Sequence, residues 1–393
     1  MAGSVILSGA RTPIGKLSGA LAGFSGSDLG ALAIKEALVR GGVDPEDVDY
    51  VFMGQVLLAG AGQMTARQAS NDAGVPLSVP STTINKVCLS GINSIMMADL
   101  LIQSGQADIV VAGGMESMTN APYLLPGARA GMRLGDGKVI DSMMHDGLFC
   151  AIDHIAMGGA TEKYAASAGL SRESQDELAA QSHERAAKAQ KDGLFDNEIV
   201  TVEVPQRKGD PVMFSVDEGV RGETTLDSLG KLRPAFDKAG NITAGNASQI
   251  SDGGAAVIVA SKAAAERIGG NPLGEIVGNG QVAGPDPSLL TQPSRAILKA
   301  LDQAGRSVSD VDLFELNEAF AAVGVASMAD LGVTDDIVNV NGGAIALGHP
   351  IGMSGTRIVL HLLNELARRG GGLGAAALCG GGGQGDALLI KTI

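Results

Sequence analysis

The chain has 393 residues, 45% of them hydrophobic and 18% charged, which is the composition of a folded globular protein and excludes a disordered one. A net charge of −14 and an aromatic content of 3% argue against binding to nucleic acid or to anionic membranes, because such surfaces attract basic proteins. The three cysteines match neither a disulfide framework nor a metal-binding pattern, and no apolar run reaches the roughly 18 residues of a membrane-spanning helix.

The first segment, "MAGSVILSGARTPIGK", has a short apolar core that predicts a strand followed by a loop. That core is too short for a signal peptide, and the segment does not resemble a transit peptide, so we predict a cytoplasmic protein. Further along, residues 37–56 predict the end of a helix, a turn and an apolar strand.

Cys88 lies at a junction between a predicted strand and a predicted helix. The stretch "VPSTTI" before it is rich in β-branched residues, and "INSIMMADLLIQSG" after it has apolar residues at helical spacing. A buried thiol often serves only to pack a core. A thiol at a helix N-terminus can instead be a nucleophile, because the helix dipole favours negative charge there and lowers the thiol pKa.

The composition changes over residues 119–247, which we predict to be an inserted loop domain. Its first part lacks clear periodicity, whereas "SRESQDELAAQSHERAAKAQKDGLF" predicts a polar amphipathic helix that begins at a serine cap. The following residues, 245–269, return to a strand and a helix.

Three segments of the first part of the chain recur in the same order near its end. The segment that begins at Ala37 resembles the one that begins at Ala300, "CLSG" resembles "GMSG", and "ADIVVAGGMESM" resembles "GAAALCGGGGQG". We therefore predict an α/β fold of two related halves with mostly parallel strands, in which equivalent loops meet near the middle. The expected domains are residues 1–118, completed by 248–270, the insert 119–247, and residues 271–393.

Four residues that can do chemistry lie in or beside these loops: Cys88, Asn317, His349 and Cys379. Each also has a structural interpretation, since Asn317 could cap a helix, His349 could belong to a turn and Cys379 could pack in the core. Together, two thiols, an imidazole and an amide at one interface indicate covalent catalysis.

The glycine run at 380–385 contains the pattern Gly-x-Gly-x-x-Gly. A dinucleotide site would need a helix after it and an acidic residue about 20 positions further on. A strand-like segment follows instead and the sequence ends at Ile393, so we reject this interpretation. We expect the glycines to let backbone N–H groups approach an oxyanion.

Seven segments together resemble the thiolase family, and most closely its acetyl-CoA C-acetyltransferase branch, the acetoacetyl-CoA thiolases. They are "NKVCLSG", "VVAGGMESMTNAPYLL", "KLRPAF", "ITAGNAS", "NEAFAAV", "NVNGGAIALGHPIG" and "ALCGGGGQG". The resemblance covers essentially the whole chain. It implies the thiolase fold, a duplicated five-layered αβαβα core with an inserted loop domain.

The resemblance also implies a role for each candidate. Cys88 would be acylated by an acyl-CoA, and His349 would activate that thiol and donate to the thioester oxygen of a bound acyl group. Asn317 would hold a water in the same oxyanion hole. Cys379 would take the α-proton of the second acetyl-CoA and later protonate the leaving thiol. Backbone N–H groups of Cys88 and Gly381 would form a second oxyanion hole.

The family's substrate-binding positions carry over in the same way. The resemblance implies that the insert binds coenzyme A and that the pantetheine and acyl groups occupy a tunnel. The CoA contacts would be Arg221, Ser228, Ala244 and Ser248, and the tunnel would be lined by Leu148, Met157, Phe236 and Phe320.

Three features depart from the family pattern. Ala156 stands where close biosynthetic relatives have histidine, and Gln249 and Ser251 replace the usual glycine and asparagine. The usual Met-x-x-Gly-Pro loop is "LLTQP" at 289–293, where we expect Leu290 to shape one wall of the acyl pocket. These differences affect acyl-chain length and CoA affinity and leave the chemistry intact.

The expected reaction is the reversible condensation of two acetyl-CoA to acetoacetyl-CoA plus CoA, without a metal or an organic cofactor. The nearest alternative is a degradative 3-ketoacyl-CoA thiolase that acts on longer chains in fatty-acid β-oxidation. A decarboxylating ketoacyl synthase would lack Cys379, and a non-catalytic acyl-CoA or lipid-binding relative would not need all four candidates. The stretch 122–141 resembles a tetramer-forming loop, so we expect a homotetramer built as a dimer of dimers.

Overall fold

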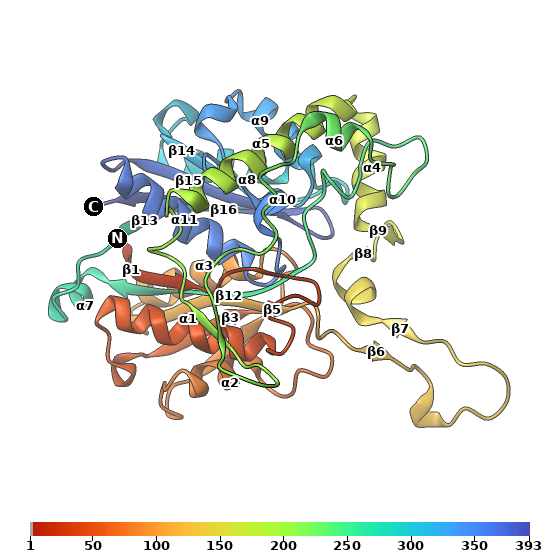
Figure 1. Ribbon diagram of the computed structural model, residues 1–393. Coiled ribbons are helices and arrows are strands. Elements are labelled where there is room, and N and C mark those ends of the chain that lie inside the picture. The colour runs from red at the N-terminus through yellow and green to blue at the C-terminus, as the bar shows by residue number, and fades with distance from the viewer. Residues whose placement is uncertain (1–2) are drawn as a thin grey trace.

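The computed structural model describes residues 3–393 and consists of two α/β halves with a largely irregular segment beside them (Figure 1). The two halves face each other, and the chain ends lie on the same side of the molecule (Figure 1). The first half comprises β1 (Ser4–Arg11), β2 (Gly15–Lys16), α1 (Gly26–Gly41), β3 (Tyr50–Gly54), α2 (Thr65–Asp72), β4 (Ser81–Ile84), α3 (Ser90–Gln103), β5 (Ile109–Ser117), β12 (Ser251–Ser261) and α7 (Lys262–Arg267).

The second half repeats this arrangement. It comprises β13 (Gly274–Ala283), α8 (Gln292–Ala304), β14 (Leu313–Leu316), α9 (Ala321–Leu331), α10 (Ala344–Leu347), α11 (Ser354–Arg368), β15 (Leu373–Gly380) and β16 (Gln384–Thr392). The segment between the halves carries β6 (Tyr123–Leu124), β7 (Ile140–Asp141), β8 (Phe149–Cys150), β9 (Ile155–Ala156), α4 (Met157–Ser167), α5 (Arg172–Lys191), β10 (Val202–Val204), β11 (Val212–Phe214) and α6 (Leu226–Gly230).

The strand order confirms the predicted duplication. The order β3-β5-β12-β1 of the first half corresponds to β14-β15-β16-β13 of the second, and the two sets join through a short pairing of β1 with β13. The prediction of mostly parallel strands is wrong. In the first half β3 pairs in parallel with β4 and β5, in the second half β14 pairs in parallel with β15, and the other strand pairs of the large sheet are antiparallel. The reason is that β16 follows β15 through a short turn, as in a hairpin, and β12 follows β5 through the long insert, so neither strand is reached through a crossover helix.

Side chains of the strands alternate between two hydrophobic cores, as the period of two in a strand requires. In β5, Ile109 and Val111 pack with α1 and α2, whereas Val110 and Ala112 pack with α3 and α11. A third core lies between α8 and the outer face of the second set of strands. Helices α3 and α11 therefore form the middle layer of five, with a sheet and an outer helix layer on each side (Figure 1).

Local sequence explains where the main helices begin and end. Ser25 caps α1 by accepting from the Asp28 N–H, and the residue after the helix is Gly42, whose φ of 60° suits glycine. Ser171 caps α5 in the same manner, which confirms the helix start predicted from the sequence. Within residues 3–393, none of the helices combines the length and the apolarity needed to span a bilayer.

An arm built from β6, β7 and the loop between them extends away from the body (Figure 1). Four of its apolar side chains are exposed, and Leu134 is fully so at 100%. They are Leu125, Met132, Leu134 and Val139. Apolar side chains gathered on a projecting arm are typical of surfaces that contact another chain.

Candidate active site

Cys88 lies in a tight turn between β4 and α3. Val87 just before it has a φ of 52°, an unfavourable conformation for a β-branched residue, so the surroundings must hold the turn in place. The Ser90 hydroxyl does so by donating to the Val87 carbonyl at 2.6 Å and accepting from the Lys86 N–H at 2.8 Å. The turn presents the Cys88 side chain, half-buried, to the space between the two halves.

The second thiol, Cys379, is fully buried near the end of β15, and the glycine turn after it packs against the Cys88 turn. A Cβ added at Gly380 would lie 2.6 Å from the Leu89 Cγ, and one added at Gly381 would lie 3.4 Å from a Val87 methyl group. Glycine at 380 therefore allows the two turns to approach. The two thiols are close enough for a charge on Cys88 to disfavour ionisation of Cys379.

His349 follows α10 and its ring is held at Nδ1. Its Nδ1 lies 2.6 Å from the Ser354 hydroxyl, which itself donates to the Pro350 carbonyl at 3.0 Å. Because a hydroxyl has one proton, the Ser354 oxygen must accept from Nδ1–H. This assignment leaves Nε2 as the unprotonated nitrogen of the neutral ring, available to accept a proton.

Asn317 lies beside this imidazole, with its Nδ2 3.5 Å from His349 Nε2. Its Oδ1 is buried and finds no hydrogen-bond partner in the described part of the chain. A buried amide oxygen without a protein donor is normally satisfied by water or a ligand. Asn317 begins no helix, since α9 starts at Ala321, so the helix-cap interpretation does not apply.

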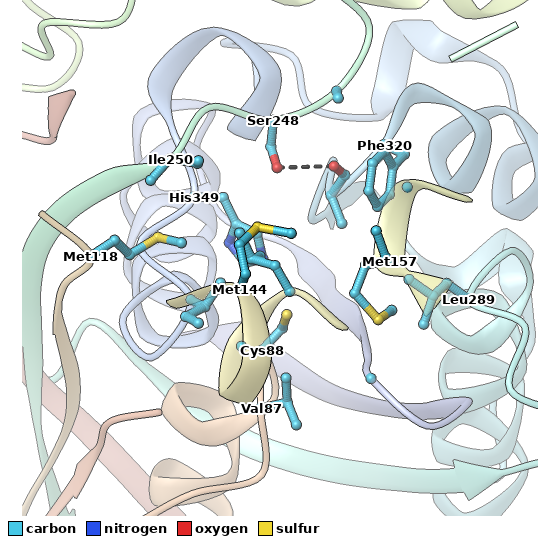
Figure 2. A pocket seen from close by; sticks show the side chains of 18 of the residues that line it. Val87, Cys88, Met118, Met144, Met157, Ser248, Ile250, Leu289, Phe320 and His349 are labelled. Atoms are coloured by element: carbon cyan, nitrogen blue, oxygen red, sulfur yellow. Dashed lines mark hydrogen bonds between the residues drawn. The ribbon is translucent and has the colours of Figure 1, made fainter. Parts of the chain in front are cut away.

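A cavity of about 330 Å³ is lined by Cys88 and His349, whereas Cys379 and Asn317 are fully buried and lie outside its lining. Figure 2 shows Cys88 and His349 in the middle of it, with Met118 and Ile250 on one side and Met157 and Leu289 on the other. Most of the lining is apolar, which suits an acyl chain and excludes water from the reacting atoms. Its lining also includes Val87, Met144, Leu148, Phe236, Ser248, Phe320, Ile351 and Gly381.

Burial controls the protonation of the thiols and the imidazole. It raises the pKa of Cys88 to about 12, and it raises that of Cys379 still further above the ordinary value. Burial also lowers the pKa of His349 to about 3. In the free protein, burial and then the nearby Glu116 charge oppose the lowering of the Cys88 pKa that was expected from the helix N-terminus and His349. At neutral pH the site contains neutral thiols and a neutral imidazole.

Of the residues predicted to bind substrate, Leu148, Met157, Phe236 and Phe320 line the cavity, as does Ser248. The Ser248 hydroxyl donates to the Ala319 carbonyl at 2.9 Å, which joins the end of the insert to the second half (Figure 2).

Arg221, Ser228 and Ala244 lie elsewhere, exposed on the surface and outside the cavity lining. The Arg221 N–H donates to His183 Nδ1 at 3.2 Å, so α5 anchors that segment. Burial, followed by the nearby Arg221 charge, lowers the pKa of His183 to about 4 and keeps Nδ1 an acceptor.

Two residues in this region were not identified correctly from the sequence. The sequence singled out Ser354 only as part of a repeated Ser-Gly pair. It lies five residues after His349, at the start of α11, and this position places its hydroxyl against the His349 ring. In the "LLTQP" loop it is Leu289 that lines the cavity, whereas Leu290 packs away from it against Ala165 and Ala322. The expectation that Leu290 forms the wall is wrong, since adjacent residues of the loop face opposite ways.

The arrangement places a nucleophile and a proton acceptor in one apolar cavity, with a second thiol and an amide buried close to them. These are the parts required for transfer of an acyl group through a covalent thioester, followed by proton removal at a second substrate.

Comparisons with known proteins support this interpretation. The family model described as "Thiolase, N-terminal domain" matches residues 4–263, and "Thiolase, C-terminal domain" matches residues 270–392. The chain is 56% identical to a probable acetyl-CoA acetyltransferase of Mycolicibacterium smegmatis, over 98% of this chain and 100% of that protein. It is 52% identical to the acetyl-CoA acetyltransferase of Cupriavidus necator, over 98% of both chains.

Two solved structures are similar over nearly their whole length. The Bacillus anthracis acetyl-CoA acetyltransferase superimposes with a TM-score of 0.97 and 41% identity, covering 100% of this chain and 99% of that one. Human mitochondrial 3-ketoacyl-CoA thiolase gives a TM-score of 0.96 at the same 41% identity and the same coverage. These matches confirm the predicted fold class.

Proposed function

Since the chain belongs to the thiolase family, whose two domain models together match residues 4–263 and 270–392, we propose that it is an acetyl-CoA C-acetyltransferase. It would catalyse the reversible condensation of two acetyl-CoA to acetoacetyl-CoA and CoA. The observation that carries the proposal is the meeting of Cys88 and His349 in one apolar cavity, beside the Cys379 turn. Relatives named acetyl-CoA acetyltransferase at 45% to 56% identity support the choice of substrate.

In the first step the Cys88 sulfur attacks the carbonyl carbon of acetyl-CoA. The thiol proton passes to His349 Nε2, the ring nitrogen that Ser354 leaves unprotonated. The C–S bond to CoA breaks, and the CoA sulfur takes its proton from Cys379. The products are acetyl-Cys88 and free CoA. Neutral partners suit this step. The alternative, a thiolate and an imidazolium formed before the substrate arrives, would require two charges to be buried in an apolar site, which is unfavourable.

In the second step Cys379 removes the α-proton of another acetyl-CoA. The resulting carbanion attacks the carbonyl of acetyl-Cys88, which forms the new C–C bond and releases the Cys88 sulfur, and His349 returns the proton to it. A water held by Oδ1 of Asn317, together with His349, would stabilise the enolate oxygen of the bound acetyl-CoA. The backbone N–H groups of Cys88 and Gly381 would stabilise the oxyanion that forms on the acetyl group of Cys88. Loss of one such donor typically costs about 3–4 kcal/mol of transition-state stabilisation.

Coenzyme A would lie against the insert, with Arg221, Ser228, Ala244 and Ser248 as contacts. Supporting this, the segments that carry Ser228 and Ala244 are neighbours, since a Cβ at Gly245 would lie 2.5 Å from side-chain carbons of Leu229 and Leu232. All proton transfers use the chain's own thiols and imidazole, so we propose that the reaction needs neither a metal nor an organic cofactor.

Thiolysis of acetoacetyl-CoA tests the proposal. Purified protein should consume acetoacetyl-CoA only when CoA is present and form two acetyl-CoA for each one consumed, and Cys88→Ser should abolish the reaction. A protein that cleaves eight-carbon 3-ketoacyl-CoA as efficiently as the four-carbon substrate would instead be the degradative enzyme. The human structural relative, which is a 3-ketoacyl-CoA thiolase, keeps this alternative open to experiment.

We further propose that the chain forms a homotetramer, as a dimer of dimers, in the cytoplasm and serves fatty-acid metabolism. The exposed apolar side chains of the arm between β6 and β7 support the assembly, because a second copy would cover them. Light scattering at micromolar concentration should give the mass of four chains, and a stable monomer would contradict the assembly.

A further inference from the structure

Gln249 lies in the segment that leads into β12, and it lines the cavity close to His349. Its side-chain Nε2 lies 3.0 Å from each of three backbone carbonyl oxygens. These belong to Gly219 of the insert and to Ile345 and Ala346 of α10. One side chain therefore connects three segments that are far apart in the sequence.

The orientation of this amide is determined by its surroundings. Gln249 Oε1 accepts from the Arg221 guanidinium at 3.4 Å, while Nε2 faces only carbonyl oxygens. A flipped amide would place an acceptor against three acceptors and a donor against a cation, so only one orientation is possible.

The carbonyls of α10 need such a donor. A helix leaves its last carbonyls without an intrahelical partner, and α10 is a single turn, so Ile345 and Ala346 depend on other groups. Both residues are buried, where water cannot replace the donor. The chain passes from α10 through Gly348 directly to His349. By binding the last carbonyls of α10, the Gln249 amide therefore also fixes the start of the segment that carries His349.

The backbone of Gln249 holds His349 as well. Its carbonyl accepts from the His349 N–H at 3.1 Å and from the Ser251 hydroxyl at 2.8 Å. The same residue thus contacts the backbone of the catalytic histidine, the helix that precedes it and the Arg221 segment of the insert.

Resting on the function proposed above, we propose that Gln249 is a positioning residue that couples the CoA-binding segment at Arg221 to the segment that carries His349. Through the α10 carbonyls it holds the imidazole over Cys88, and through Gly219 and Arg221 it holds the coenzyme A contact. Acyl transfer requires a bound thioester and a correctly positioned base, His349, and both then depend on the Gln249 amide.

Substitution of Gln249 tests this coupling in two directions. Gln249→Ala removes both sets of contacts, so we expect the KM for CoA in thiolysis to rise and kcat to fall, each by roughly fivefold, the effect of about one hydrogen bond. Gln249→Glu keeps an acceptor for Arg221 but turns an ionised oxygen towards three carbonyls. It should lower kcat more than it raises KM for CoA, because the contact with Gly219 is lost but that with Arg221 is kept, whereas Arg221→Ala should raise that KM with little change in kcat.

A second variant displaces the amide without altering it. A Cβ at Gly219 would lie 2.8 Å from Gln249 Nε2 and 2.9 Å from the Ala346 carbonyl oxygen, so Gly219→Ala should reproduce the Gln249→Ala kinetics. The matched control is Gln206→Ala in the exposed part of the insert, where the amide donates only to the Val204 carbonyl, and it should behave as the parent.

Two measurements are independent of the reaction. Calorimetry of CoA binding reports the Arg221 side, and the rate of Cys88 alkylation by iodoacetamide reports the His349 side. Gln249→Ala should weaken CoA binding and change the alkylation rate even if the parent protein proves not to cleave acetoacetyl-CoA, which would refute the proposed function alone. A Gln249→Ala protein with parental CoA affinity, alkylation rate and kinetics, or one changed only in its thermal midpoint, would overturn the coupling.

Discussion

At the residue scale, burial has the largest effect on the chemistry of the site. Cys88 lies two residues before the first residue of α3, a position that favours a thiolate, yet its pKa rises to about 12 because the pocket is apolar. His349 is held neutral for the same reason, with a pKa of about 3. In the free protein the Cys88 thiol and the His349 imidazole are therefore both neutral, and proton transfer between them must accompany bond formation with the substrate.

The rate at which Cys88 reacts with an alkylating reagent should depend on pH. Because its folded pKa is raised, alkylation by iodoacetamide should be slow at neutral pH and should still be increasing above pH 9, the ordinary thiol value. The rate is measured by mass spectrometry between pH 6 and 10, with Cys88→Ser as the unreactive control. A plateau reached below pH 8 would instead indicate a preformed thiolate paired with a protonated His349.

At the scale of single elements, the sequence predicted which segments meet but not which side chains point inwards. The Cys88 turn, the His349 loop and the Cys379 turn are recognisable because glycines and breaks in periodicity mark them. The facing of Leu289 and Leu290 depends on how the loop before α8 is twisted by its contacts with α4 and α9, which local sequence does not encode. The roles of Ser354 and Gln249 were missed for the same reason, since Ser354 acts on the His349 ring and Gln249 on backbone carbonyls of the insert and of α10.

Leu289 and Leu290 provide a matched pair for testing the wall of the acyl pocket. Both are buried, but only Leu289 lines the cavity and packs near Cys379. Leu289→Ala should raise kcat/KM for the six-carbon 3-ketoacyl-CoA relative to the four-carbon one, since each methylene that can be buried contributes about 0.8 kcal/mol. Leu290→Ala should cost a similar amount of stability, about 2–5 kcal/mol, without changing that ratio. Equal ratios in the two variants would show that Leu289 is not a wall of the acyl pocket.

At the scale of the whole molecule, the sequence predicted the duplication but did not predict the direction in which the strands pair. The repeated helix, strand and Ser-Gly segments predicted two similar halves, because each repeat carries its own periodicity. The antiparallel strands were missed because β12 follows the insert, so its partners β1 and β5 are separated from it by more than a hundred residues. Buried polar contacts between distant segments were invisible for the same reason.

One such buried network joins the insert to both halves. Arg11 of β1 bonds to Glu198 at 2.8 Å and to Asp217 at 2.7 Å, and Glu198 also contacts His361 of α11 at 3.0 Å. Burial would raise the pKa of Glu198, but the charges of His361 and Arg11 outweigh it and lower that pKa to about 2. The stability that ionised Glu198 contributes is therefore present above pH 4.5 and lost as the pH falls towards 2.

Removing this carboxylate should loosen the insert. Glu198→Ala leaves Arg11 buried with only part of its charge compensated, which we expect to lower the free energy of unfolding by about 3–5 kcal/mol at neutral pH. The control is Asp227→Ala, which breaks an exposed ion pair between α6 of the same insert and Lys231 just after it, and should cost at most about 1 kcal/mol. Thermal unfolding and limited proteolysis compare the two variants, and equal behaviour would contradict a role for the buried network in fastening the insert.

The covalent intermediate on Cys88 is the central claim, and the Cys379→Ser variant allows it to be seen directly. This variant keeps the nucleophile and a hydroxyl that can give a proton to the leaving CoA, but lacks the thiol proposed to remove the α-proton, so acetyl-Cys88 should accumulate after acetyl-CoA is added. Intact-protein mass spectrometry followed by peptide mapping should find one acetyl group per chain, on the peptide that contains Cys88. An acetyl group on another residue, or a chain that stays unmodified while the parent protein cleaves acetoacetyl-CoA, would contradict the account.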